Sequence, residues 1–393
     1  MEPNNKDLQL HNGKGVALAK FVFCMAFVAL MIVPFLFLNT ETDLQSEIEN
    51  RAMTAWPGLS LTGEYNEWYG HYVEDRVAFR EPAIMAYITG HYMLFHEFTE
   101  DLHMFGKDGY IFPADDGYIR AYQHEATDEQ LIDDFVTYLD RTNTYLGEQG
   151  ISFYFIAGLD KKSVYDRYMP DSIHVNEDKE SIMAMLDRKL TERDVPHVIP
   201  VEEMKERSRS EQLYNVMVDS AHWNDNGALY ELQLLDGQMR LTVPDISPLE
   251  SKHFKAKTKT EQLEFIKLPL EEEVPFQKLR NKYAKHVKLD LSICNGVTLE
   301  DGTSMVGYIN DREGCDKSVL IFHDSFLEGR ERFFTYRFQK SYFVSRRNYT
   351  HVQEYVELLQ PDVVIFENAE RAFVDDLYMY TELADITYDN SSD

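Results

Sequence analysis

The chain has 393 residues, 44% of them hydrophobic and 13% aromatic, which is enough apolar material for one large or two ordinary globular domains and excludes a disordered protein. Its formal net charge is -29, from 68 acidic and 39 basic residues, so its average field repels nucleic acid and anionic lipid headgroups. Nucleic-acid binding is therefore not expected, and a neutral substrate is favoured over a strongly polyanionic one.

The N-terminal region contains one candidate membrane segment. Residues 16–38 are apolar except for Lys20, and about 20 such residues suffice for a helix to cross the hydrocarbon core. Basic residues lie at or before its start, and acidic residues follow it (Lys6, Lys14, Lys20; Glu41, Asp43, Glu47, Glu49). By the positive-inside rule, residues 1–15 form a cytoplasmic tail and the rest of the chain, from about residue 40, lies outside the cytoplasm.

A cleaved signal peptide is the alternative for this segment. Such a peptide has a shorter apolar core and small residues before the cleavage site, whereas this run ends in FLFLNTETD. We therefore predict an uncleaved, single-pass transmembrane anchor in the cell membrane.

Residues 39–118 are predicted to form a linker and a helical module. A polar stretch comes first, and residues 63–95 then carry aromatic and aliphatic side chains at helical spacings, interrupted by Pro82. The turn-rich segment 106–117 contains a short apolar strand, Tyr110 to Phe112, and is interpreted as a junction.

Residues 119–393 are predicted to form an α/β domain. Helical patterns at 128–148, 177–194 and 350–360 alternate with short apolar strands at 151–158, 195–200, 318–324 and 361–368. This alternation is typical of a doubly wound parallel sheet flanked by helices. The charged stretch from about 243 to 305 lacks the alternation and is interpreted as an insertion, partly β.

A candidate nucleophile follows the strand Val319 to Phe322. Ligand sites in α/β sheets form beyond the carboxyl ends of the strands, and His323, Asp324 and Ser325 occupy that position. A serine at a strand-to-helix turn is exposed beside backbone N–H groups that stabilise an oxyanion, so His323 and Asp324 mark a candidate oxyanion region. Alternatively, Asp324 simply caps the helix expected to begin there.

A candidate base for this serine lies about a hundred residues earlier. Asp219 and His222 are three residues apart, which places both side chains on one face of a helical or turn-like step. Asp219 would then orient the imidazole while Nε2 faces the serine. Surface Asp–His pairs are common, so the pair gains its meaning only from its combination with the later HDSF segment.

The paired motifs resemble the SGNH-like, membrane-anchored family that includes the alginate O-acetyltransferases and the DHHW proteins. In that family an acidic residue and a histidine precede a tryptophan, and a later segment reads GDSF; here these are Asp219, His222, Trp223 and HDSF at 323–326. Further blocks match in order: ENR at 49–51, EDRVAFR at 74–80, GKDGYIF at 106–112, DKKSVYDRYMP at 160–170, HWNDNGA at 222–228 and PDVVIFENAER at 361–371.

The resemblance implies an SGNH-hydrolase-like fold and an acyl-serine mechanism. Ser325 would take an acetyl group and His222 would act as base and then acid, held in place by Asp219. The acceptor would be a hydroxyl of an exported or cell-surface polysaccharide, and the acyl donor a multi-pass membrane-bound O-acyltransferase. A carbohydrate esterase with the same triad, or a noncatalytic glycan-binding or assembly subunit, remain alternatives.

The sequence departs from the family pattern at two points. His323 stands where glycine is usual, which changes backbone freedom beside the nucleophile and leaves the noncatalytic alternative open. The acid–base pair reads DxxH, where the alginate enzymes commonly have DxH.

Other polar residues are weaker candidates. Arg346 and Tyr342 could bind a glycan hydroxyl or an acyl oxyanion, although a solvated turn is the favoured explanation for the arginine. Lys161 is either site-lining or structural, and Trp223 is a candidate for substrate binding. Cys294 and Cys315 are the cysteines outside the membrane segment, and they form either two thiols or one disulfide. Because their spacing matches no zinc pattern, neither a metal nor a cofactor is predicted.

Overall fold

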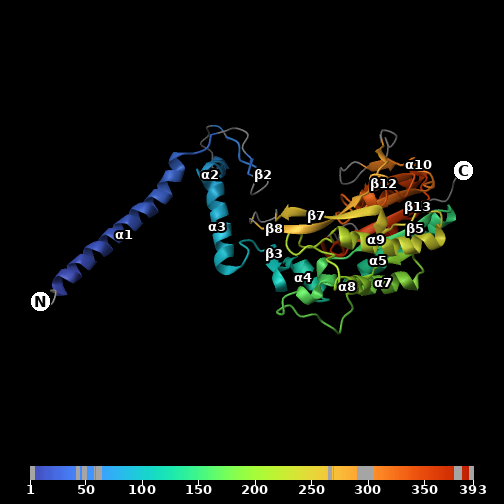
Figure 1. Cartoon of the computed structure of the whole chain (residues 1–393), viewed down its shortest axis with the longest axis horizontal. Helices are drawn as coiled ribbons and strands as arrows, with labels where there is room; N and C mark the ends of the chain where they lie inside the picture. The colour runs from blue at the N-terminus through green and yellow to red at the C-terminus, as the bar shows by residue number, and fades with distance from the viewer. Residues whose placement is uncertain are drawn as a thin grey trace. The chain divides into compact units, whose positions relative to one another are not determined.

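The computed structural model describes residues 5–40, 45–46, 51–56, 58, 64–263, 268, 270–289, 305–375 and 383–388. The chain forms two compact units (Figure 1). The first comprises Met1–Thr99 with Glu264–Pro269, and the second Glu100–Leu263 with Leu270–Asp393. The second unit begins at Glu100. The division predicted from the sequence, a helical module up to residue 118 and an α/β domain from residue 119, stays a prediction.

The first unit contains three helices and a short antiparallel strand pair. Its elements are α1 (Asn5–Leu36), β1 (Gln45–Ser46), β2 (Arg51–Ala52), α2 (Glu64–Arg76) and α3 (Arg80–Phe95). Within α1, Gly15–Leu36 has a mean hydropathy of 2.6 and none of it is buried, so by length and composition it is a candidate membrane span. The break between α2 and α3 falls at residues 77–79 and not at Pro82, because a proline in the first turn of a helix has no N–H bond to lose.

Two of the sequence blocks meet at the junction of these elements. Arg51 forms a bidentate pair with Asp75, with distances of 2.6 and 3.1 Å, and the N–H of Thr54 donates to the same carboxylate at 2.7 Å. The hydrogen bonds from Arg51 hold the pKa of Asp75 well below its usual range, against the effect of burial. The buried Arg76 donates to the carbonyl oxygens of Asn39 and Thr54, each at 3.2 Å. Arg51, Asp75 and Arg76 therefore hold the chain that follows α1.

The second unit is built on a seven-stranded sheet with the order β6-β5-β13-β11-β12-β10-β9. The strands are β5 (Ser152–Gly158), β6 (His197–Val198), β9 (Val287–Lys288), β10 (Val306–Ile309), β11 (Ser318–His323), β12 (Lys340–Ser345) and β13 (Val363–Ala369). The first five strands of this order, β6, β5, β13, β11 and β12, pair in parallel. Strand β10 is antiparallel to both β12 and β9. The predicted parallel α/β class is confirmed, with an antiparallel edge that the sequence did not indicate.

The remaining elements are helices and two hairpins. The helices are α4 (Asp116–Tyr122), α5 (Glu129–Glu148), α6 (Lys161–Val164), α7 (Ile182–Glu192), α8 (Val201–Arg207), α9 (Asp225–Thr242), α10 (Val352–Leu359) and α11 (Ala372–Asp375). The hairpins are β3 (His103–Phe105) with β4 (Ile111–Pro113), and β7 (Phe254–Gln262) with β8 (Glu271–Leu279). The second hairpin lies inside the predicted insertion, whereas Cys294 lies outside the described residues.

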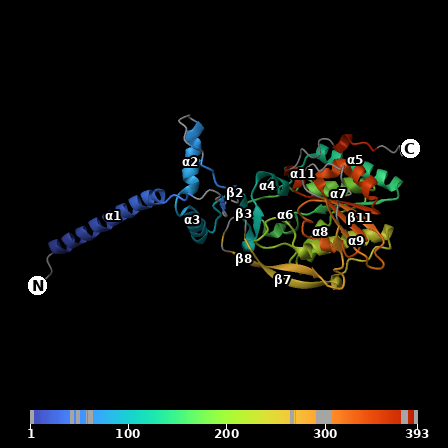
Figure 2. The ribbon, with the colours of Figure 1, turned by 90° about the horizontal axis from the view of Figure 1, so that it is seen from above.

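Alternation along β5 shows how the sheet is covered on both faces. Phe155 meets Phe135 of α5 at a ring-centroid distance of 5.6 Å, while its neighbour Tyr154 shares a hydrogen bond with Thr242 of α9. Because successive side chains of a strand point to opposite faces, α5 and α9 cover opposite sides of the sheet, as Figure 2 shows. The all-apolar strands read from the sequence are therefore buried on both faces.

Candidate active site

The candidate nucleophile lies at the carboxyl end of β11, in the middle of the sheet. Residues 325–329 form turns and not the helix expected from the sequence. The Asp324 carboxylate accepts two backbone hydrogen bonds at this turn. Its Oδ1 accepts one from the N–H of Phe326 at 2.9 Å, and its Oδ2 accepts one from the N–H of Ala369 at 2.6 Å. The turn is thereby tied to β13, and Ser325 is left exposed at its tip.

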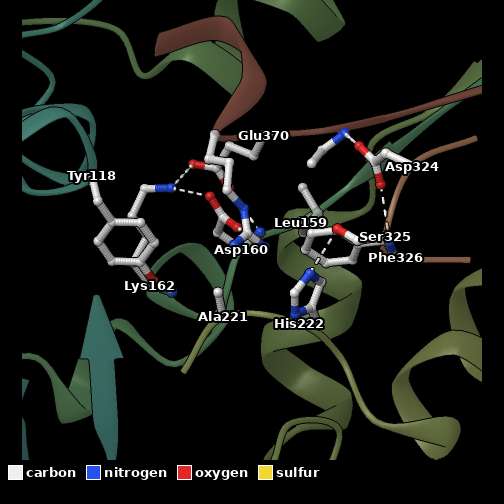
Figure 3. A network of polar contacts seen from close by, with 12 residues as sticks. Tyr118, Leu159, Asp160, Lys162, Ala221, His222, Asp324, Ser325, Phe326 and Glu370 are labelled. Atoms are coloured by element: carbon white, nitrogen blue, oxygen red, sulfur yellow. Dashed lines mark hydrogen bonds and ion pairs between the residues drawn. The ribbon is translucent and has the colours of Figure 1, made fainter. Parts of the chain in front are cut away.

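The acid–base pair lies on a loop that ends at α9. Asp219 Oδ1 accepts the backbone N–H groups of Ala221 and His222 at 2.9 and 2.8 Å, which folds the segment into the turn-like step that the spacing predicted. The Nδ1 of His222 lies 3.0 Å from Asp219 Oδ2, and its Nε2 lies 2.9 Å from the Oγ of Ser325. Figure 3 shows the imidazole facing the serine. The structure therefore brings all three predicted residues into one hydrogen-bonded chain.

The electrostatics of this chain favour a base at Nε2. Burial raises the pKa of Asp219, but the charge and hydrogen bond of His222, the N–H of Ala221 and the charge of Lys161 outweigh it and hold the pKa well below its usual range. An ionised Asp219 favours the imidazole tautomer that carries its proton on Nδ1. Nε2 is then free to accept the hydroxyl proton of Ser325.

Two oppositely charged side chains hold the loop that carries Asp219. On one side, Glu272 of β8 accepts the successive backbone N–H groups of residues 216, 217 and 218 at 2.7, 2.8 and 3.1 Å. On the other, the fully buried Lys161 donates to the carbonyl oxygens of Asp219 and, at 3.0 Å, Ile111. Burial lowers the pKa of Lys161 to about 8, against the charges of Asp219 and Glu272. These contacts favour the structural reading of Lys161 over substrate binding.

Trp223 supports the nucleophile turn. Its indole is buried and donates from Nε1 to the carbonyl oxygen of Phe326 at 2.8 Å. The Phe326 ring packs edge-on against Trp223 and lies 4.8 Å from the imidazole of His222. On its far side, Phe326 lies so close to Gly158 that a Cβ there would be 2.7 Å from its ring. Glycine at the end of β5 therefore makes room for the nucleophile turn.

Arg346 and Tyr342 do not line the site surface either. Arg346 is buried, with Nε 3.3 Å from Asp324 Oδ2 and Nη1 donating to the side chain of Asn368 at 3.2 Å. Tyr342 is buried in β12, where it pairs with Leu320. Substrate binding by these two residues stays a prediction, and their burial does not favour it, because the sequence placed them near the sheet edge but did not show the direction of their side chains.

The oxyanion region differs in part from the prediction. The N–H of Asp324 donates to Glu367 at 2.8 Å, which does not favour the predicted oxyanion role of Asp324. Nδ1 of His323 faces the carbonyl oxygen of Asp324 at 2.8 Å, and its ring contacts Phe343. Within the described part of the chain, the N–H of Ser325 donates no hydrogen bond, which leaves it available beside Oγ.

A buried charge network lies next to the triad and was missed from the sequence. Lys162 Nζ lies 2.7 Å from Asp160 and 2.9 Å from Glu370 (Figure 3). Arg371 lies 3.0 Å from Asp160. Arg371 also lies over the ring of Phe326, at 5.2 Å, which links the network to the nucleophile turn. The rule that found Ser325, polar residues directly after an apolar strand, also applies to residues 370 and 371 after β13 and would have found them.

No metal cluster is present in the residues that the structure describes, since no three His, Cys, Asp or Glu side chains gather there as such a site needs. The expectation of a reaction without metal or cofactor stays a prediction.

Comparisons with known proteins identify the fold. No protein-family profile matches the sequence. No curated protein matches it either. Among solved structures, PatB1 from Bacillus cereus, solved with a sulfonyl adduct, has a TM-score of 0.53 at 13% identity, covering 71% of this chain and 98% of that one.

Two further structures are similar at lower scores. The O-acetyltransferase domain of AlgJ from Pseudomonas putida has a TM-score of 0.47 at 13% identity, covering 72% and 98% of the two chains. A DHHW family protein from Eubacterium siraeum has a TM-score of 0.45 at 12% identity, covering 72% and 96%. This chain therefore shares its α/β fold with PatB1 over 71% of its length, which agrees with the fold that the resemblance implied.

Proposed function

We propose that the protein is a serine-dependent O-acyltransferase in which Ser325, His222 and Asp219 form the catalytic triad. The observation that carries this proposal is the continuous hydrogen-bonded chain from Asp219 through His222 to the exposed hydroxyl of Ser325. A nucleophile hydrogen-bonded to a base that a third group orients is the arrangement that acyl transfer needs.

The first half-reaction loads the enzyme. Oγ of Ser325 attacks the acyl carbonyl while Nε2 of His222 takes the hydroxyl proton, and the resulting oxyanion accepts the free N–H of Ser325. Collapse of the tetrahedral intermediate breaks the bond to the leaving group, which receives the proton from Nε2. Asp219 stays ionised and stabilises the imidazolium throughout.

The second half-reaction transfers the acyl group. A sugar hydroxyl gives its proton to Nε2 and attacks the acyl-serine, and Oγ leaves and recovers that proton. We propose a hydroxyl of an exported or cell-surface polysaccharide as the acceptor, supported by the resemblance of the motif blocks and by the net charge of -29, which disfavours a polyanionic glycan. The acetyl group would come from a multi-pass membrane-bound O-acyltransferase.

The membrane anchor is part of this proposal. The span Gly15–Leu36 would hold the protein beside such a donor, with its N-terminus in the cytoplasm and its catalytic unit outside. The order of charges around the span, basic before and acidic after, supports this orientation.

An esterase is the second candidate, since Ser325 is exposed and water can reach an acyl group bound to it. Incubation of the full-length protein with an activated acetyl ester, with and without neutral oligosaccharides, separates the two activities. Acetylated sugar formed by the wild type and not by Ser325→Ala supports transfer. Release of acetate at an equal rate with every sugar, with no acetylated product, supports the esterase. The proposed triad is contradicted if neither reaction depends on Ser325.

A further inference from the structure

Helix α3 is apolar on all sides, which is the composition of a helix that is surrounded by protein or lipid. Residues 82–96 contain no Asp, Glu, Lys or Arg, and include aliphatic and aromatic side chains at every turn. A helix that is apolar all round normally lies in a protein core or in a membrane.

The described residues of the first unit cover this helix only in part. The structure describes every residue of α3 and none of them is buried. Four of its large apolar side chains are open to solvent: Tyr87 is 64% exposed, Met93 71%, Leu94 77% and Phe95 61%. A contiguous exposed surface of this kind marks a site of contact with another apolar phase.

The start of α3 is tied to the end of the candidate membrane span. The N–H of Ala78 donates to the carbonyl oxygen of Pro34, in the last turn of α1, at 3.1 Å, and the N–H of Asn39 donates to the carbonyl of Arg76 at 2.8 Å. The first bond satisfies a carbonyl that the end of α1 leaves open, and the second satisfies one at the end of α2. Because α3 begins at Arg80, two residues after Ala78, it starts where the span would leave the bilayer.

We propose that α3 lies in the membrane–water interface as a second lipid contact beside α1. With 16 residues, α3 is about 24 Å long, which is shorter than the hydrocarbon core of about 30 Å, so it rests in the interface and does not cross. Apolar stretches of this length are typical of interfacial segments. This inference rests on the proposed anchoring by α1.

Site-specific labelling of the full-length protein in zwitterionic lipid nanodiscs tests the proposal. The first variant carries Cys294→Ser and is treated with a thiol-reactive fluorescent label. Cys315 is 2% exposed and does not react in the folded protein. The label therefore attaches to Cys24 on α1 and reports on the span. A second variant adds Cys24→Ser and Leu94→Cys to report on α3. A third adds Cys24→Ser and Glu74→Cys on α2, where the glutamate is 69% exposed, as a matched water-facing control.

Quenching by brominated lipids gives the result. The label at Leu94→Cys is expected to be quenched mainly by bromines near the headgroup end of the acyl chains. The label at Cys24 is expected to be quenched mainly by bromines near the bilayer centre. The label at Glu74→Cys is expected to be quenched by neither. A label at position 94 that only an aqueous quencher reaches overturns the proposal. So does one that neither quencher reaches, which would mean that a second copy or another protein surface covers α3.

These readings are independent of catalysis. If Cys24 is unquenched, the anchoring by α1 is wrong, while position 94 still decides whether α3 contacts lipid. The double variant Leu94→Glu, Phe95→Glu is expected to lose the lipid contact of α3 and to keep the turnover of an activated acetyl ester. If the wild type shows no turnover, the proposed enzyme fails and the quenching result stands.

Discussion

Glu272 offers a test of how the active site is held, because it lies on β8 and touches none of the triad side chains. The substitution Glu272→Gln keeps the size of the side chain but replaces one acceptor oxygen by an NH2 group. That group then faces the backbone N–H donors of residues 216–218, which the carboxylate accepts at 2.7, 2.8 and 3.1 Å. At least one hydrogen bond to a charged acceptor is lost, and each is worth about 1.5–3 kcal/mol.

The loop so released carries Asp219 and His222. A displacement of about 1 Å at reacting groups costs on the order of 100-fold in rate, so we expect kcat for an activated acetyl ester to fall by about 10- to 100-fold with a smaller change in KM. The free energy of unfolding should fall by about 1.5–3 kcal/mol.

The assay is steady-state hydrolysis of an activated acetyl ester together with denaturant unfolding, in wild type and variant. Glu273→Gln is the matched control, since the neighbouring side chain is exposed and bonds Thr260 of β7. Glu273→Gln should match the wild type in both measurements. A Glu272→Gln variant with the rate and stability of the wild type would refute the role assigned to this carboxylate.

Three further changes have defined outcomes. In Gly158→Ala the new Cβ would lie 2.7 Å from the Phe326 ring, so esterase activity should fall about tenfold or more, whereas Gly147→Ala in α5 meets nothing within 4 Å and should keep it. Lys162→Met leaves two buried carboxylates facing each other and should lower the denaturant-measured free energy of unfolding by about 3–5 kcal/mol; an effect under about 1 kcal/mol would contradict the buried network. Lys161 has a pKa of about 8 in the folded state and 10.5 in the unfolded state. Between these two pH values the folded state binds fewer protons than the unfolded state. The free energy of unfolding therefore rises with pH across this range, by up to about 1.4 kcal/mol per pH unit. Unfolding measured from pH 7 to 10 should show this rise in the wild type, and Lys161→Met should remove it; an identical pH dependence in both would contradict the assignment.

The parts of this protein that the sequence predicts are those set by local patterns. Continuous apolar runs identify the central strands, because strands buried on both faces need them, and β11 and β13 begin and end close to the predicted limits. The pairing of His222 with Ser325 could be predicted because both belong to motifs whose order matches a known family.

The remaining contacts depend on side-chain direction and on long-range packing. Lys161, Trp223 and Arg346 follow strands or motifs where a site residue is expected, and only the fold shows that they point into the protein. Glu272 belongs to a run of three glutamates in the predicted insertion. Nothing local distinguishes it from its neighbours, since its partners lie more than fifty residues earlier in the chain.

The central claim is that Ser325 is a nucleophile activated by His222. Its most direct test is intact-mass spectrometry, with peptide mapping, of the full-length protein after brief exposure to an activated acetyl ester or a sulfonyl fluoride. The account predicts one adduct on Ser325, absent in Ser325→Ala, formed at least about 1000-fold more slowly in His222→Ala, and unchanged in Ser318→Ala, which removes a buried serine of β11. An adduct that persists in Ser325→Ala, or a rate that does not depend on His222, would contradict it.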